Sequence, residues 1–155
     1  MCTFFVGEIM DEFYMNEALK EAEKAYISGE VPIGAIIVEN GKIIARAHNT
    51  KDLDNCAIRH AEINAIEMAS KYKNNWRLNN CVMYVTLYPC PMCASAINQS
   101  RMSKVIYGTK SDNADFELVE KILSDNLYGN KVIIDGEILE NKCGKLLKKF
   151  FSEKR

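Results

Sequence analysis

Four residues of this chain combine types and spacing that could do chemistry: His60, Glu62, Cys90 and Cys93. Two thiolates and one imidazole suit Zn²⁺, and a zinc site with only three protein ligands keeps a fourth position open for water. Zinc lowers the pKa of that water from about 15.7 to about 7. Glu62 lies too close to His60 to be a comfortable fourth ligand, but it could transfer protons in the reaction. The pattern therefore predicts a catalytic zinc site.

The Cys-x-x-Cys motif by itself would allow other interpretations. It also occurs in redox pairs and in structural zinc sites with four ligands. His60 alone could be an ordinary histidine, and Glu62 alone could be a solvated helix carboxylate. Their occurrence together ahead of Pro-Cys-x-x-Cys favours catalysis. No second Cys-x-x-Cys completes a structural site, because the remaining cysteines stand singly: Cys2, Cys56, Cys81 and Cys143.

The elements around these residues are expected to bring two helix N-termini to the metal. The spacing of apolar residues predicts a helix over 60–72 that opens at His60. A second helix is expected over 90–100, with both cysteines in its first turn. The dipoles and free amides of two converging helix starts would favour the thiolate forms of Cys90 and Cys93.

The rest of the chain alternates between helical and strand patterns. Asn40-Gly41 between two apolar runs is a strong signal for a two-residue hairpin, Asp11 is placed to cap the first helix, and Pro89 ends the strand before the cysteines. Strands are expected over 33–39, 42–48, 82–87, 104–107 and 131–135, and further helices over 12–27, 117–127 and 139–151. This order predicts an α/β fold, a three-layer sandwich with a five-stranded mixed sheet between helices on both faces. The site should lie at the carboxyl end of the strands that lead into the zinc helices.

The composition is typical of a globular domain. With 155 residues, of which 48% are hydrophobic and 26% charged, the chain is expected to form a single domain over 1–155. Its net charge of −1 gives no overall attraction to nucleic acid. Acidic side chains gather near the N-terminus and basic ones near the C-terminus. The simpler interpretation is two solvated helix faces. The more specific interpretation is a basic C-terminal patch that attracts an RNA backbone.

The cysteines and the N-terminus indicate a reducing compartment. Residues 1–10 lack the basic start and the long apolar stretch of a signal peptide. No apolar run approaches the roughly 20 residues that span a bilayer. We therefore expect a cytoplasmic protein, not bound to membranes, whose cysteines are free or bound to metal. Residues 1–10 could also be an extra leader before a start at Met10.

The pairing of His-x-Glu with Pro-Cys-x-x-Cys is the general signature of zinc nucleobase deaminases. Beyond this motif, the chain from about 12 to 151 resembles the cytidine deaminase-like superfamily, and within it the bacterial tRNA-specific adenosine deaminases. The stretches that carry the resemblance are 30–35, 48–49, 60–62, 84–87, 89–94, 100–101, 146–147 and 150–151. The zinc motif is common to the superfamily and indicates the mechanism, whereas the surrounding stretches narrow the range of expected substrates.

The resemblance implies a hydrolytic deaminase with one Zn²⁺ per subunit that converts adenosine to inosine at the wobble position of a tRNA. The partner would be the anticodon loop, whose target base enters the pocket in a flipped conformation. The resemblance also implies a homodimer in which both subunits border the pocket.

The resemblance further assigns roles to individual residues. Asn49 would hydrogen-bond the target base. The wall and rim of the base pocket would be formed by Val31, Pro32, Ala61 and Tyr88. The candidate contacts to RNA are Ser100, Arg101 and Lys110.

Three features depart from the family pattern. Tyr88 stands where the family usually has glutamate, Ser95 replaces a usual glycine, and the segment 109–116 contains no glycine where the family has a glycine-rich loop. A segment without glycine does not readily form turns with positive φ. A deaminase of a free base or nucleoside, such as guanine or cytosine, is therefore the second interpretation. A noncatalytic zinc or RNA-binding module is the third, and Glu62 argues against it because a structural site needs no proton shuttle.

Overall fold

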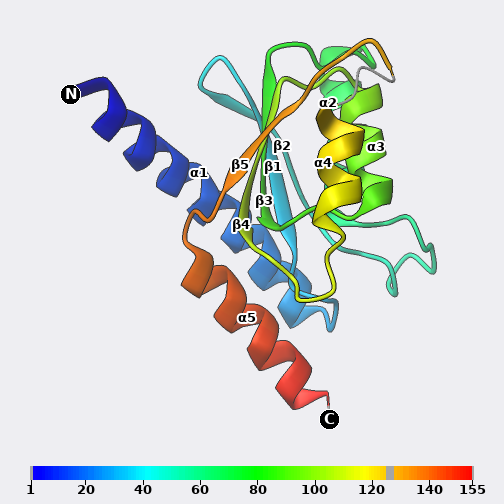
Figure 1. Cartoon of the computed structure of the whole chain (residues 1–155). Coiled ribbons are helices and arrows are strands. Elements are labelled where there is room, and N and C mark those ends of the chain that lie inside the picture. Colours follow the sequence, from blue (N-terminus) through cyan, green and yellow to red (C-terminus); the bar gives the residue numbers. More distant parts are fainter. Residues whose placement is uncertain (1, 125–127, 155) are drawn as a thin grey trace.

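A five-stranded sheet in the order β2-β1-β3-β4-β5 forms the centre of the protein (Figure 1). The computed structural model describes residues 2–124 and 128–154, with side chains from residue 6 onward. β1 runs antiparallel to β2 and β3, whereas β3, β4 and β5 are parallel to one another. The strands are Gly34–Glu39 (β1), Lys42–His48 (β2), Cys81–Leu87 (β3), Lys104–Thr109 (β4) and Ile133–Gly136 (β5).

Helices cover both faces of this sheet (Figure 1). One face is covered by α1 (Cys2–Ile27) and α5 (Glu140–Glu153), and the other by α2 (Ala61–Lys73), α3 (Pro91–Gln99) and α4 (Phe116–Ser124). The parallel strands β3, β4 and β5 are joined by crossovers that contain α3 and α4, as parallel pairing requires. The predicted three-layer α/β sandwich with a five-stranded mixed sheet is therefore confirmed.

β1 is buried on both faces, which explains its nearly continuous apolar sequence. Ala35 and Ile37 belong to the core under α2, α3 and α4, and Ile36 and Val38 belong to the core under α1 and α5. The hairpin to β2 turns at Asn40-Gly41, where both residues have positive φ angles of 49° and 75°. These φ values are those of the predicted two-residue hairpin turn.

The start of α1 differs from the prediction. The helix begins at Cys2, not at 12, so Asp11 lies inside it and does not cap it. The Asp11 carboxylate instead accepts a hydrogen bond of 2.7 Å from the Tyr84 hydroxyl on β3. Extending an existing helix is far easier than nucleating one, so the packed part of α1 can carry residues 2–10 in helical form. In Figure 1 this first part of α1 projects beyond the sheet, and its apolar side chains Val6 and Ile9 are exposed.

The simpler interpretation of the N-terminal acidic residues, a solvated helix face, is wrong for two of them. Glu17 and Glu21 are buried, with 8% and 5% of their surface exposed. Glu17 accepts a hydrogen bond of 2.5 Å from Arg46, and Glu21 lies 2.8 Å from the His48 ring. α1 lies across β2, so these carboxylates meet basic partners that are distant in sequence.

The remaining predicted boundaries agree with the structure to within about three residues, apart from one that is not described. The predicted helix 117–127 begins as α4 at Phe116, and its last residues, 125–127, lie outside the described part of the chain. Met68 and Tyr72, which helped to predict α2, are exposed, and the buried face of that helix consists mainly of alanines. Across the described residues, no helix is both long and apolar enough to cross a membrane.

Candidate active site

His60, Cys90 and Cys93 come together where α2 and α3 begin. His60 is the N-cap residue of α2 and Cys90 is the N-cap residue of α3, and both have extended backbone angles. Cys93 follows in the first turn of α3. The Nδ1 atom of His60 lies 3.7 Å from the Cys90 sulfur and 3.6 Å from the Cys93 sulfur. The structure thus brings the three predicted ligands to one point, as the two helix starts require.

The geometry of these three atoms fits zinc. Typical Zn–N and Zn–S bonds in a tetrahedral site place nitrogen and sulfur about 3.6 Å apart. The two nitrogen to sulfur distances, 3.6 and 3.7 Å, match this separation. Among the described residues, no other group of three histidine, cysteine or acidic side chains is close enough to hold a metal ion. The other described cysteines, Cys56, Cys81 and Cys143, are therefore not additional ligands.

The surroundings of the two thiols favour a thiolate at Cys90. A hydrogen bond from Cys93, together with His60, lowers the pKa of Cys90 to about 4 despite its burial. The same contact with Cys90, together with burial, raises the pKa of Cys93. The Cys90 hydrogen bond also raises the pKa of His60. One thiolate is thus present without metal, and binding of a cation has to release the proton of Cys93.

Glu62 is a buried carboxyl group next to these ligands. It lies in the first turn of α2, and only 4% of its surface is exposed. Burial is the main cause that raises its pKa to about 7, and the nearby Cys90 adds to the shift. A carboxyl group with a pKa near 7 can both accept and donate a proton at neutral pH, which general acid-base catalysis requires. The interpretation of Glu62 as a solvated helix carboxylate is therefore wrong.

The residues expected to form the base pocket occupy the edge of the sheet at which α2 begins. Asn49 directly follows β2 and is 95% buried, and its backbone N–H donates to the Ile33 carbonyl at 3.1 Å. Its side-chain oxygen accepts a hydrogen bond of 3.3 Å from the backbone N–H of Lys51. Pro32 and Ala61 are buried. Contact of these residues with a base stays a prediction.

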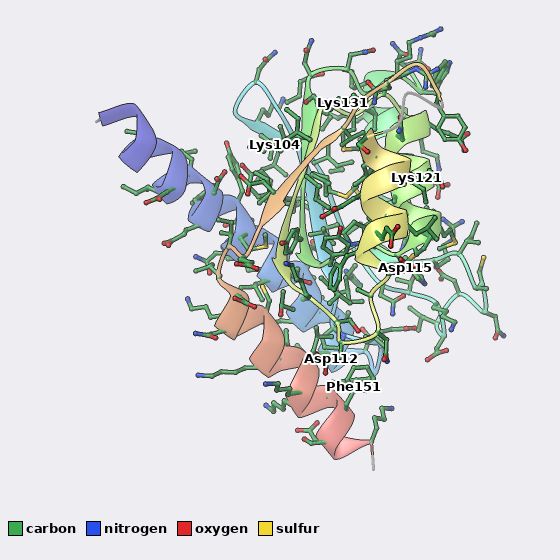
Figure 2. All side chains as sticks on the ribbon, in the orientation of Figure 1. Lys104, Asp112, Asp115, Lys121, Lys131 and Phe151 are labelled. Carbon is green, nitrogen blue, oxygen red and sulfur yellow. The ribbon has the colours of Figure 1, made fainter. Side chains whose placement is uncertain are left out.

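Val31 lines a groove of about 540 Å³ between the carboxyl end of β3 and helix α5. Leu87 and Lys110 lie on the same groove, together with Lys145 and Lys148 of α5. Asp112 and Phe151, which also line it, lie near one another at one end of the molecule (Figure 2). The groove thus combines apolar walls with three lysine ammonium groups and the carboxylates of Asp112 and Glu140.

Tyr88 packs in an aromatic cluster. Its ring meets those of Tyr107 and Phe116 edge to face, with centroids 4.9 Å apart in both pairs. Burial raises its pKa to about 12, and its hydroxyl has no hydrogen-bond partner among the described residues. The side chain therefore supports the packing of α4 on β4, and its predicted place at the rim of the base pocket stays untested.

Ser100 and Arg101 are not brought to the metal ligands. They follow the C-terminal end of α3, whereas the cysteines lie at its N-terminal end. A rise of 1.5 Å per residue separates the two ends of this helix by about 13 Å. The Arg101 guanidinium instead lies 5.6 Å from the ring of the exposed Trp76.

Two sets of hydrogen bonds near the site were missed by the sequence analysis. Asn64 of α2 donates hydrogen bonds to the residues on either side of Asn49. The carboxylate of Glu30, 2% exposed, accepts bonds from the backbone N–H groups of Asp52 and Leu53. Both interactions join segments distant in sequence, and the only available signal was a polar residue between apolar neighbours.

Comparison with known proteins places this arrangement in a family. The family described as "Cytidine and deoxycytidylate deaminase zinc-binding region" matches residues 9–109, which include all the proposed zinc ligands. The tRNA-specific adenosine deaminase of Bacillus subtilis (strain 168) is 44% identical over 146 residues, covering 94% of this chain and 91% of that protein.

Solved structures agree with this placement. A structure from "Biochemical and Structural Studies of A-to-I Editing by tRNA:A34 Deaminases at the Wobble Position of Transfer RNA" is 34% identical with a TM-score of 0.81, covering 87% of this chain and 99% of that one. The guanine deaminase of Nitrosomonas europaea has a TM-score of 0.81 at 20% identity, covering 91% of this chain and 84% of that one, and shares the fold. With its two-cysteine, one-histidine cluster and buried glutamate, the chain therefore belongs to the cytidine and deoxycytidylate deaminase family and is a zinc-dependent hydrolytic deaminase.

Proposed function

We propose that the protein converts adenosine to inosine at the wobble position of a tRNA. The observation that carries this proposal is the 44% identity to a tRNA-specific adenosine deaminase over nearly the whole chain. Further support comes from the solved structure of the tRNA:A34 deaminase study, which is 34% identical. The zinc site and Glu62 would perform the same chemistry on any suitable nucleobase. The assignment of the substrate therefore rests on these relatives.

The residues of the site divide the reaction between them. His60, Cys90 and Cys93 would hold zinc, which supplies a water molecule that ionises near neutral pH. Glu62 would take the two protons of the attacking water in turn, and would pass the first to the ring nitrogen and the second to the leaving amino group. A C6–O bond forms, the C6–N bond breaks and ammonia leaves. Asn49 would orient the base by a hydrogen bond to its edge.

The groove beside α5 suits an RNA backbone. Lys110, Lys145 and Lys148 line it, and ammonium groups neutralise phosphates without reading sequence. Lys110 already pairs with Glu137 at 3.2 Å, so Lys145 and Lys148 are the stronger candidates for phosphate contacts. A free base has no phosphate and would gain nothing from this groove.

We also infer that the protein acts as a homodimer in the cytoplasm. Leu53 and Ile58, in the segment between β2 and α2, are 69% and 52% exposed, which is typical of side chains covered by a partner. Arg101 is too far from its own metal cluster to meet RNA bound there, and a second subunit could place it beside the partner's site. The described cysteines are all free thiols, which fits a reducing compartment.

The substrate can be tested directly. Zinc-loaded protein is incubated with a tRNA that carries adenosine at the wobble position, with the same tRNA carrying guanosine there, and with adenine, adenosine, guanine, cytosine and cytidine. Ammonia release and base conversion are measured for each. Inosine formed in the first tRNA alone is the expected result. Conversion of a free base or nucleoside with an unreacted tRNA would replace the tRNA assignment by the small-molecule alternative.

A further inference from the structure

We infer that Asn64 is a positioning residue that holds the base-binding Asn49 in place relative to His60 and Glu62. This inference rests on the proposed role of Asn49 in binding the base. Asn64 does not need to touch the substrate, because it acts through the backbone of His48 and the side chain of Thr50, the two neighbours of Asn49. Asn64 thereby joins α2, the helix that carries the reacting groups, to the loop that is proposed to orient the base.

The Asn64 side chain donates hydrogen bonds to both neighbours of Asn49, to the backbone of one and to the side chain of the other. Its amide nitrogen donates a hydrogen bond of 2.9 Å to the carbonyl oxygen of His48, the residue before Asn49. It donates a second, of 3.0 Å, to the hydroxyl oxygen of Thr50, the residue after it. Asn49 itself is tied to Ile33 by its own N–H at 3.1 Å. Two of these hydrogen bonds hold the backbone at His48 and Asn49, and the third holds the side chain of Thr50.

An amide is the group that satisfies all the neighbours of Asn64. The Arg59 guanidinium donates to the Asn64 side-chain oxygen at 3.3 Å, which leaves the NH₂ group to face His48 and Thr50. The Thr50 hydroxyl donates its proton to Asp54 at 2.6 Å and keeps a lone pair for the amide. An aspartate would set a carboxylate against the His48 carbonyl, and an alanine would leave that carbonyl without this donor.

The backbone of Asn64 connects these side-chain hydrogen bonds to the reacting groups. Its N–H donates to the carbonyl oxygen of His60 at 3.0 Å, in the first turn of α2. Glu62 lies between them on the same turn. A displacement of about 1 Å between a bound substrate and the reacting groups can lower a rate by about a hundredfold. The contacts of Asn64 oppose such a displacement of the base relative to Glu62.

A double-mutant cycle separates positioning from general structural support. We would compare Asn49→Ala, Asn64→Ala and the double variant by the kcat/KM for deamination of the wobble-adenosine tRNA. Zinc content and melting temperature are measured for each protein. We expect Asn64→Ala to lower kcat/KM about tenfold with full zinc content, the scale of one lost hydrogen bond. In the Asn49→Ala background the same change should have little further effect.

Three further variants complete the experiment, and the first of them is a control. Asn98→Ala on α3 removes a fully buried amide, which donates to the Ile122 carbonyl at 2.7 Å, and should lower the melting temperature without changing kcat/KM. If Asn64→Ala does not fold, Thr50→Val removes one acceptor of the amide and should lower kcat/KM about threefold. Asn64→Asp should be as impaired as Asn64→Ala, because it lacks the donor.

Several outcomes would overturn the inference. An unchanged kcat/KM in Asn64→Ala would show that Asn49 holds its place alone. Full additivity of the two substitutions, or a loss that Asn98→Ala reproduces, would make Asn64 a structural residue only. The proposed tRNA substrate can fail separately, in which case the wild-type protein deaminates a free base or nucleoside. The same cycle measured on that compound would then still test the role of Asn64.

Discussion

Glu62 shows how the fold changes the chemistry of a single residue. In an exposed helix turn this carboxyl group would be ionised at neutral pH. Burial under the start of α2 raises its pKa to about 7, so that the protonated and ionised forms are both populated. The same helix start holds His60 beside the cysteines. Proton transfer and metal binding thus depend on one turn of backbone.

Replacing Glu62 by glutamine should abolish proton transfer without removing the metal. The amide keeps the shape of the side chain but cannot accept the proton, and general acid-base groups contribute typically 10²- to 10⁴-fold. We expect kcat to fall by about that factor while zinc content, measured by atomic emission, stays at the wild-type level. Glu67→Gln, at an exposed carboxylate of the same helix, is the matched control and should retain activity. Full activity in Glu62→Gln would remove Glu62 from the mechanism.

Replacing Cys93 by serine should remove the metal. A serine hydroxyl does not ionise near neutral pH and is a poor zinc ligand compared with a thiolate. We expect Cys93→Ser to lose zinc and deaminase activity together, and a chelator to have the same effect on the wild-type protein. Cys56→Ser changes a free thiol outside the cluster and should keep both. If Cys93→Ser retained one zinc per chain, another ligand set would have to be sought.

At the scale of elements, two buried carboxylates of α1 contact side chains of β2. Glu17 accepts hydrogen bonds from Lys20 at 2.7 Å and from Arg46 at 2.5 Å. Glu21 lies 2.8 Å from His48, the residue before Asn49. These contacts join α1 to β2, the strand that leads to Asn49. The acidic face of α1, which the sequence suggested to be solvated, thus contacts the sheet through Glu17 and Glu21.

The Glu17 pairs should make stability depend on pH in a defined direction. Lys20, and next Arg46, hold the pKa of Glu17 below its usual range. A lowered pKa in the folded state stabilises the protein above the unfolded-state pKa, and this stability is lost as the pH falls through the folded-state value. We expect Glu17→Gln to lower the free energy of unfolding by about 1 kcal/mol at pH 7, and by less near pH 3. Urea unfolding at the two pH values measures this, and an equal loss at both would exclude the ion pairs as the cause.

At the scale of the whole molecule, the lysines are distributed unevenly with respect to the metal cluster. The net charge of −1 gives no overall attraction to RNA. Yet Lys145 and Lys148 line the groove that begins at the carboxyl end of β3, close to where the cysteines follow. Lys131 lies at the opposite end of the molecule from Phe151 (Figure 2). If the groove binds the RNA backbone as proposed, its local charge, and not the net charge of the protein, determines the attraction.

Charge reversal in this groove should weaken tRNA binding through its electrostatic part. In Lys145→Glu/Lys148→Glu we expect weaker binding and a slope of log K against log salt that is smaller by about one for each lost phosphate contact. The reaction of a free nucleoside, if any occurs, should be unaffected. Lys131→Glu makes the same kind of substitution at one position at the far end, with half the charge change, and should bind like the wild type. A salt slope identical in both variants would exclude the groove as the path of the backbone.

The sequence by itself predicted the three candidate metal ligands and Glu62, which the structure brings together, and it determined the order of the elements. These features are local, because the ligands follow directly from residue type and from their places at two helix starts, and strands and helices follow from short periodic patterns. Asn40-Gly41 likewise specifies its turn through the φ angles that these residues tolerate. Information of this kind needs no knowledge of distant contacts.

Only the tertiary structure decided the environment of these residues. Asp11 was predicted to cap α1 and instead bonds Tyr84, and the burial of Glu17 depends on β2, which lies far along the chain. Packing between separate elements likewise produces the hydrogen bonds from Asn64 to both neighbours of Asn49. It also produces the raised pKa of Glu62. Burial and hydrogen bonding between distant segments are properties of the folded sheet, which is why no pattern within the sequence could specify them.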